Sequence, residues 1–471
     1  MYWYDEMIYY FHPPNRFHGA TRSKSIRIAH IYPTKGPTMA SNQLTDRRRV
    51  LRGLAVAATL PTILARPAWS QANPVKISFG WPFANGTQGI EELAKRFSEE
   101  KRTIQVEVQV IPQAQVLPRL TTAFTGGQAP DCLGMSDAWL AQFAGGGWLS
   151  DLEDLISASG IEKELVPASM QLARLYKGRA YYAGFVVEPY AVYYNKKHYA
   201  EAGISQAPRD VDEFRNTAIK LTNRARNRYG YYAMGGSGWQ FQQWSTWMVN
   251  HGGLGVANTM YDAQGKCVLA SAKHIEGLEK WVALYQVDKV SPPASATGTF
   301  QDQTNAFNAG QIGTVMGWGQ YLSTLANGIG EENLGTALPP MGPAGQFFFY
   351  GGNGFAINKN TAHREACWEF IQFMLRADNN ARWNQMGGAI PTARQAWSAD
   401  WLKAPKYVAP MEMINRANAL INNPRYLPGY GSFQTQFAPE QIQRTLLGRQ
   451  TAAEHAKAVA NALDELRAKA G

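Results

Sequence analysis

The chain has 471 residues, of which 46 are basic and 36 are acidic, and its formal net charge is +10. The first 72 residues hold 10 of the basic and 3 of the acidic residues, so residues 73–471 have a net charge of only +3. This balance gives no support to a nucleic-acid partner. Residues 73–471 are numerous enough for two domains with their own cores, and no apolar run among them reaches the ~20 residues that span a membrane.

Residues 46–72 have the layout of an export signal. A cationic head (Arg47, Arg48, Arg49 and Arg52) precedes an uncharged, mostly apolar run (53–65) and a small-residue ending (Ser70 and Ala72). A buried core helix, the alternative, would have to accept three successive arginines at its start and Pro61 in its interior. The apolar run is too short to span a bilayer.

The segment DRRRVLR, which begins at Asp46, resembles the twin-arginine consensus, with Arg47 and Arg48 as the pair. The resemblance implies export of a folded chain to a bacterial periplasm. No cysteine follows the apolar run, so we expect a soluble mature protein that begins at Asn73 and has no lipid anchor there. We expect Met39 to be the true start, which makes residues 39–72 the signal peptide and residues 1–38 a non-native or disordered extension.

From residue 73 onward, strand and helix patterns alternate. Predicted strands cover 75–81, 103–110 and 131–135, and predicted helices cover 88–101, 116–127 and 137–147. The second strand alternates apolar and polar residues strictly, whereas the first helix places its apolar residues at helical spacing. Such an alternation predicts βαβ units and a mostly parallel sheet, and therefore the α/β class.

The pattern restarts after residue 199. Residues 210–226 are predicted to form a helix, with Asp210 as its N-cap and Glu213 completing a capping box. Further helices are predicted near 241–250, 273–287, 301–309, 363–376 and 451–470, and further strands at 312–318 and 351–360. Residues 338–346 read as a Pro/Gly-rich linker between the last two strands.

Motifs for common enzyme chemistry do not occur. The sequence has no phosphate-binding GxxxxGK[ST] motif, and GGSGW lacks the final glycine of GxSxG because Trp239 occupies that position. The histidines after residue 73 are scattered without metal-ligand spacing. Asp151, Glu153 and Asp154 fit the solvated start of a helix. We therefore predict no catalytic residue, metal or cofactor, although a carboxylate pair distant in sequence stays open.

Three cysteines, Cys132, Cys267 and Cys367, form no CxxC pair. An odd number leaves at least one thiol unpaired within the chain. Cys132 and Cys367 lie in apolar surroundings, where cysteine acts as a small buried hydrophobic residue.

Five segments, in order over about residues 126–397, resemble one family. They are GGQAPDCLGMSDAWLAQFAGGGWLSDLEDL, FVVEPYAVYYNKKHYAEAGISQAPRDVDEF, AFNAGQIGTVMGWGQYL, GGNGFAINKNTAHREACWEFIQFM and GGAIPTARQAW. The family is that of the extracellular solute-binding proteins of ABC importers, in the branch that includes maltose-type sugar binders. The loop WPFANGTQ departs from the family pattern because it has no charged residue, which argues against close similarity in ligand to the maltose branch.

The resemblance implies two α/β lobes, each with a mostly parallel sheet, and a ligand in the cleft between them. The first lobe would hold residues 73–187 and 347–382, and the second 189–340 and 383–471. The hinge would lie near 186–190 and 341–346. The implied function is capture of a sugar or polyol-like solute and delivery to the transmembrane subunits of an ABC permease, by a monomer that catalyses nothing.

Sugars present apolar faces and hydroxyl groups, so aromatic and polar residues just after strands are the ligand-binding candidates. By their match to cleft segments of the family, these are Trp81, Ser136, Asp137, Glu188, Tyr190, Trp239, Trp318, Gly352, Asn353 and Arg394. Trp318 matches the family best. Trp81 and Trp239 could equally lie in the core, which is also the alternative for Trp318, and Arg394 could only fix a turn. Trp148, Trp281 and Trp368 have helical apolar spacing and are predicted core residues.

Two alternatives remain at this point. A binder of a phosphorylated or sulfonated sugar-like solute would need converging basic side chains or helix N-termini. An exported enzyme, such as a glycosidase or esterase, would need a carboxylate pair or a serine–histidine couple in the cleft.

Overall fold

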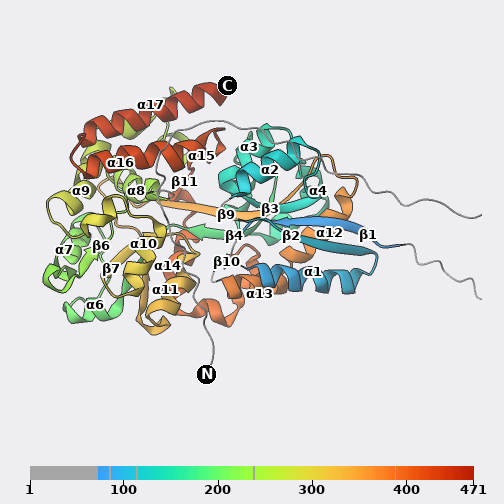
Figure 1. The fold of residues 1–471 in the computed structure, drawn as a ribbon, viewed down its shortest axis with the longest axis horizontal. Coiled ribbons are helices and arrows are strands. Elements are labelled where there is room, and N and C mark those ends of the chain that lie inside the picture. The colour runs from blue at the N-terminus through green and yellow to red at the C-terminus, as the bar shows by residue number, and fades with distance from the viewer. Residues whose placement is uncertain (1–72, 84–85, 113–114, 237–238, 388, 471) are drawn as a thin grey trace, which may run out of the picture. The chain divides into compact units, whose positions relative to one another are not determined.

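The computed structural model describes residues 73–83, 86–112, 115–236, 239–387 and 389–470 (Figure 1). The predicted extension and signal peptide lie outside these residues. The strands are β1 (Val75–Trp81), β2 (Ile104–Val110), β3 (Cys132–Ser136), β4 (Ala183–Pro189), β5 (Ala191–Asn195), β6 (Tyr229–Tyr231), β7 (Ile312–Gly317), β8 (Leu334–Ala337), β9 (Phe348–Ile357), β10 (Ile390–Pro391) and β11 (Leu420–Ile421).

The α-helices are α1 (Thr87–Lys101), α2 (Val116–Thr125), α3 (Asp137–Gly145), α4 (Glu153–Ser159), α5 (Pro167–Ala173), α6 (Lys196–Glu201), α7 (Val211–Leu221), α8 (Gln240–Gly252), α9 (Ala272–Gln286), α10 (Phe300–Asn308), α11 (Tyr321–Ile329), α12 (Arg364–Leu375), α13 (Ala377–Gly387), α14 (Pro405–Asn415), α15 (Tyr430–Ser432), α16 (Ala438–Leu446) and α17 (Ala452–Ala470). Strands and helices alternate along the chain, which confirms the α/β class. None of the helices in the described part is long and apolar enough to cross a membrane.

The first sheet has the strand order β10-β4-β9-β3-β1-β2, and β11 also pairs with β9. β1 is parallel to β2 and β3, as the βαβ pattern predicts. β9 is antiparallel to both β3 and β4, because it returns to this sheet from the second one. The first sheet is therefore mixed, and the expectation of a mostly parallel sheet holds only for its β3-β1-β2 part and for the β9-β11 pair.

The second sheet has the order β6-β7-β5-β8. β5 is antiparallel to β7 and β8, and β6 is parallel to β7. The prediction of a mostly parallel sheet is wrong here. The physical reason is that β5 continues directly from β4 with only Tyr190 between them, so its direction is set by the crossing from the first sheet.

The chain returns to the first sheet between β8 and β9. The predicted second crossing at 341–346 is held by groups of α7, of α8 and of Arg209, which precedes α7. Met341 N–H donates to the Arg209 carbonyl at 2.9 Å, and Val211 N–H donates to the Met341 carbonyl at 3.1 Å. Asn250 Oδ1 accepts the Phe347 N–H at 2.8 Å. The chain then enters the first sheet at Phe348, where β9 begins. That the two lobes rotate about the crossings at 186–190 and 341–346 stays a prediction.

The C-terminal part of the chain touches both sheets. The division by sequence placed residues 383–471 in the second lobe, but β10 pairs with β4 and β11 pairs with β9 in the first sheet. Trp383 also lies 5.7 Å from Trp81 between ring centroids, with the rings edge to face. Short segments after α13 therefore complete the first sheet, which periodicity could not show because strands of two residues have no readable pattern.

The predicted N-cap of α7 is confirmed, but the predicted capping box is not. Asp210 Oδ1 accepts the N–H groups of Asp212 and Glu213, as expected of an N-cap. Glu213 does not close the capping box, because its carboxylate accepts the Arg209 N–H instead. The helix ends at Leu221, earlier than predicted, and a short 3-10 turn follows.

Two of the three core tryptophans predicted from helical spacing are buried, and the third is half-buried. Trp281 and Trp368 are fully or almost fully buried, and Trp148 is half-buried against Phe124 at 5.6 Å between ring centroids. All three cysteines are buried and unpaired. The prediction that Cys132 and Cys367 act as buried hydrophobic residues is confirmed.

Candidate functional site

A cavity of about 120 Å³ lies where strands of both sheets end, and we call it the main cavity. The residues that line it are Phe83, Ser136, Asp137, Ala138, Trp139, Glu188, Trp239, Trp318, Gln320, Gly351, Gly352, Asn353 and Arg425. Ser136 and Asp137 come from the end of β3, whereas Trp318 and Gln320 directly follow β7 of the second sheet. Residues at strand ends of both sheets thus line one cavity, and strand ends are where α/β folds bind ligands.

A buried ion pair forms one side of the main cavity. Asp137 Oδ2 accepts a hydrogen bond from Arg425 Nη1 at 2.5 Å, and the two side chains are only 1% and 6% exposed. Asp137 is the first residue of α3, where the helix dipole favours a carboxylate. A Cβ atom on Gly351 would lie 2.5 Å from Arg425 Nη1. Glycine at this position of β9 therefore leaves the space that the ion pair occupies.

Aromatic rings form the other walls. The Arg425 guanidinium lies 4.8 Å from the ring centroid of Trp318, within the range of a cation–π contact. Phe83 and Trp139 stack at 5.8 Å with an interplanar angle of 14°. Trp239 is half-buried and packs edge to face on Phe300. Such flat faces beside fixed polar groups suit a ligand with both apolar faces and hydroxyl groups.

Glu188 is the carboxylate near the end of β4 and lines the same cavity. No hydrogen bond to its side chain is found among the described residues. Burial away from water, followed by the nearby charge of Asp137, raises the pKa of Glu188 to about 7, although Arg425 opposes this shift. The side chain is therefore a group that can donate or accept a hydrogen bond near neutral pH.

Glu188 should make stability depend on pH. Its pKa rises from 4.5 in the unfolded chain to about 7 in the folded protein, so the folded state binds more protons between these values. Stability should thus fall as pH rises from about 4.5 to about 7, by an amount on the order of 3 kcal/mol at 1.36 kcal/mol per pKa unit. Urea denaturation at pH 5 and pH 8 measures it. Glu188→Gln should remove this part of the loss, and an unchanged pH dependence in the variant would contradict the assignment.

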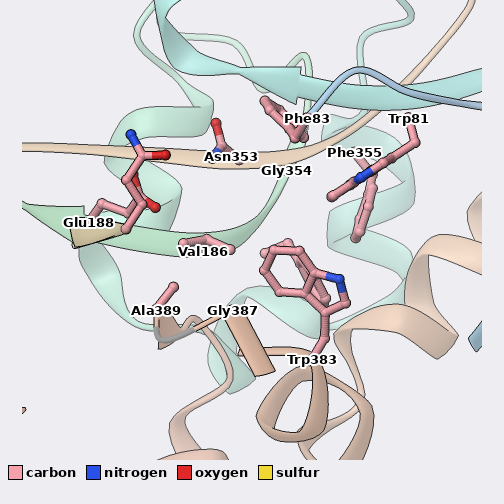
Figure 2. A pocket seen from close by; sticks show the side chains of 12 residues that line it. Trp81, Phe83, Val186, Glu188, Asn353, Gly354, Phe355, Trp383, Gly387 and Ala389 are labelled. Atoms are coloured by element: carbon pink, nitrogen blue, oxygen red, sulfur yellow. The ribbon is translucent and has the colours of Figure 1, made fainter. Parts of the chain in front are cut away.

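A smaller cavity of about 50 Å³ adjoins the main cavity, and we call it the annex (Figure 2). Its lining residues are Trp81, Phe83, Phe185, Val186, Glu188, Gln320, Asn353, Gly354, Phe355, Trp383, Gly387 and Ala389. Four of these, Phe83, Glu188, Gln320 and Asn353, also line the main cavity. The two cavities are therefore neighbouring parts of one site.

The sequence matches the family described as bacterial extracellular solute-binding protein over residues 83–381, which is more than half of the chain. The chain is a member of this family. This family consists of binding proteins, which agrees with the prediction that the chain catalyses nothing. Among the residues that the structure describes, no three His, Cys, Asp or Glu side chains gather as a metal site.

Individual relatives of this solute-binding protein are distant. A binding protein of Brucella abortus (strain 2308) is 25% identical over 72% of this chain and 81% of its own length. The erythritol/L-threitol-binding protein of Mycolicibacterium smegmatis is 26% identical over 70% of this chain and 77% of its own length. A solute-binding protein of Thermotoga lettingae, solved with α-D-tagatose, has the same fold, with a TM-score of 0.71, 21% identity, and coverage of 84% and 100% of the two chains.

The structure gathers most of the predicted site residues of this solute-binding protein. The main cavity is lined by seven of the ten, namely Ser136, Asp137, Glu188, Trp239, Trp318, Gly352 and Asn353. Trp81 lines the annex. That these residues bind a ligand stays a prediction.

Two predicted site residues line neither cavity. Tyr190 is completely buried, donates its hydroxyl to the Met316 carbonyl, and supports Trp318 from behind at 5.1 Å between ring centroids. Arg394 is exposed, and its Nε donates to the Leu165 carbonyl at 2.9 Å. The side chain of Arg394 thus links two segments at the surface. This agrees with the alternative that Arg394 only fixes a turn.

Sequence reasoning missed Arg425, Gln320, Phe83, Trp139 and Trp383. Gln320 and Phe83 each follow a predicted site tryptophan by two residues, so extending the strand-end argument by two positions would have found them. Arg425 lies in a Pro-rich C-terminal segment with no periodicity, and only its contact with Asp137 reveals its role.

Proposed function

We propose that this solute-binding protein captures a small, neutral sugar or polyol in the main cavity and delivers it to the transmembrane subunits of an ABC permease. The observation that carries the proposal is the pairing of aromatic walls with a fixed ion pair in one cavity of about 120 Å³. This modest volume favours a small solute over a long oligosaccharide. The ligands named for the M. smegmatis and T. lettingae proteins, a tetritol and a ketohexose, are of this kind.

The charge of the cavity favours a neutral solute over a phosphorylated or sulfonated one. Arg425 is the only Lys, Arg or His among the described residues that line it. Because its guanidinium is already paired with Asp137, no positive charge is left for an anion. Glu188 adds a second carboxyl group, which would repel an anion when ionised.

The two carboxyl groups also bear on the enzyme alternative. Asp137 and Glu188 both line the main cavity, but Asp137 is held by Arg425 and is almost completely buried. A carboxylate fixed in this way is placed to orient hydroxyl groups, as in a binding site. This reading agrees with the family to which the chain belongs.

We further propose that the protein works in the periplasm after export by the twin-arginine route. The arginine pair, the short apolar run and the small-residue ending at Ala72 support this proposal. N-terminal sequencing of the exported protein should begin at Asn73, and a start more than a few residues away would contradict it.

A thermal-shift experiment tests the solute class. Erythritol, L-threitol and D-tagatose should be compared with glucose 6-phosphate on the purified protein. A neutral solute that binds only the folded state should stabilise it by about 2.7 kcal/mol at a concentration 100-fold above its Kd. Trp239→Ala should reduce the shift, whereas Trp401→Ala, a half-buried tryptophan that lines neither cavity, should not. A shift with the sugar phosphate alone would contradict the proposal.

A further inference from the structure

The annex differs in chemistry from the main cavity that it adjoins. Its far walls are the rings of Trp81, Phe185, Phe355 and Trp383, together with the aliphatic side chains of Val186 and Ala389. Its carboxyl and amide groups are those of Glu188, Gln320 and Asn353, which it shares with the main cavity. Figure 2 shows Ala389 and Trp383 on one side of the annex and Phe83 and Asn353 on the other. Polar groups therefore mark the boundary with the main cavity, and hydrocarbon lies beyond it.

The aromatic walls are fixed by close packing. Trp383 Nε1 donates to the Gly86 carbonyl at 3.0 Å, which fixes the orientation of the indole. A Cβ atom on Gly86 would lie 2.3 Å from the Trp383 ring, so glycine is required there for the ring to sit in this place. A Cβ atom on Gly134 of β3 would likewise lie 2.9 Å from the Phe83 ring. Two glycines thus make room for the rings that enclose the annex.

The side of the annex that these rings enclose suits an apolar group better than water. A buried water usually makes two to four hydrogen bonds, and cavities lined by hydrocarbon stay dry or bind apolar molecules. The volume of about 50 Å³ is small, so the annex suits part of a solute whose remainder lies in the main cavity.

We propose that the annex is a subsite for an apolar group on the solute, so that the preferred ligand is a deoxy or O-methyl sugar or polyol. Its hydroxyl groups lie among Asp137, Glu188 and Asn353, and its methyl group lies in the annex against the rings of Trp81 and Trp383. This inference rests on the proposed function and names the substrate class within it.

Matched pairs of solutes test the subsite. Binding should be measured by isothermal titration calorimetry for D-galactose with 6-deoxy-D-galactose, D-glucose with 6-deoxy-D-glucose and with methyl α-D-glucopyranoside, and erythritol with its 1-O-methyl ether. In at least one of the pairs that bind, the apolar member should bind about fourfold tighter, or more, than its hydroxyl counterpart. This is the gain in affinity expected from burying one methylene group.

Filling the annex should remove this preference. Ala389→Leu places three more carbon atoms in the annex. The affinity of the apolar member divided by that of its hydroxyl counterpart should therefore fall to about one or below. Ala389→Val is a smaller change for the case in which leucine prevents folding. Ala396→Leu makes the same substitution at a buried alanine that lines neither cavity, and it should keep the wild-type ratio.

The outcomes separate the two proposals. Binding of solutes with no preference for any apolar member, or a preference that survives both Ala389 variants, overturns the subsite and leaves the proposed function intact. Absence of binding by every neutral solute overturns the proposed function and the subsite with it.

Discussion

Arg425→Met should lower the free energy of unfolding of the ligand-free protein by about 3–5 kcal/mol. The variant leaves the Asp137 carboxylate buried without its partner, and a buried charge with no counter-ion is far more costly than a broken surface pair. It also removes the cation from the Trp318 face and one wall of the main cavity. Sugar or polyol binding should therefore weaken as well.

Urea denaturation of the wild-type protein and the variant measures this loss. The double variant Asp137→Leu with Arg425→Met should recover most of the stability, because replacing both partners of a buried pair by apolar residues is often neutral. Arg444→Met is the control, since Arg444 is about half exposed and lies 3.9 Å from Glu440. It should change stability by no more than about 1 kcal/mol. A loss at Arg425 as small as that at Arg444 would contradict the role given to the buried pair.

Trp318→Ala should reduce both stability and affinity. Trp318 is 3% exposed and packs between Tyr190 and the Arg425 guanidinium, so its loss should leave a cavity that costs about 3–5 kcal/mol. Because the same ring lines the main cavity, we also expect a loss of roughly 1–3 kcal/mol in binding, or about 5- to 150-fold in affinity. The sequence set the site and the core against each other as alternatives for this residue, whereas in the structure the ring is buried and also lines the main cavity.

Denaturation and calorimetry on the same variant separate the two effects. Trp318→Phe keeps an aromatic face and should lose less of both quantities. Combining Trp318→Ala with Arg425→Met should give a total loss of stability that is smaller than the sum of the single losses, because the two side chains are in contact. Wild-type affinity in Trp318→Ala would remove the ring from the binding surface, and wild-type stability would remove it from the core.

Much of the site could be predicted because it lies at strand ends. Periodicity locates the ends of β1, β3 and β7, and the residues that follow a strand in an α/β fold face the ligand. Trp318, Ser136 and Asp137 were found in this way. Tyr190 was misplaced because it lies between two strands, where a one-residue shift turns a side chain from the cavity to the core.

The remainder depends on contacts that local patterns do not encode. Asp137 and Arg425 are 288 residues apart in sequence, and nothing around Arg425 indicates its partner. The antiparallel place of β9 in the first sheet is also a contact between distant segments. All four strands of the second sheet lie between β4 and β9 in the sequence. The predicted strand at 351–360 begins with Gly351. Why glycine is needed there becomes clear only from the fold, which brings Arg425 into the space that a Cβ atom would fill.

The place of β9 has a consequence for the order in which this protein can be built on the ribosome. β9 lies between β4 and β3 in the first sheet, yet it is translated after both of them and after all four strands of the second sheet. Until residue 348 emerges, the facing edges of β3 and β4 have no strand between them, and unpaired edges invite pairing with other chains. Translation at ~5–20 residues per second leaves this gap open for roughly 8–32 seconds after β4. The nascent protein therefore exposes these two strand edges over this interval, and the main cavity is completed only when Arg425, near the end of the chain, is made.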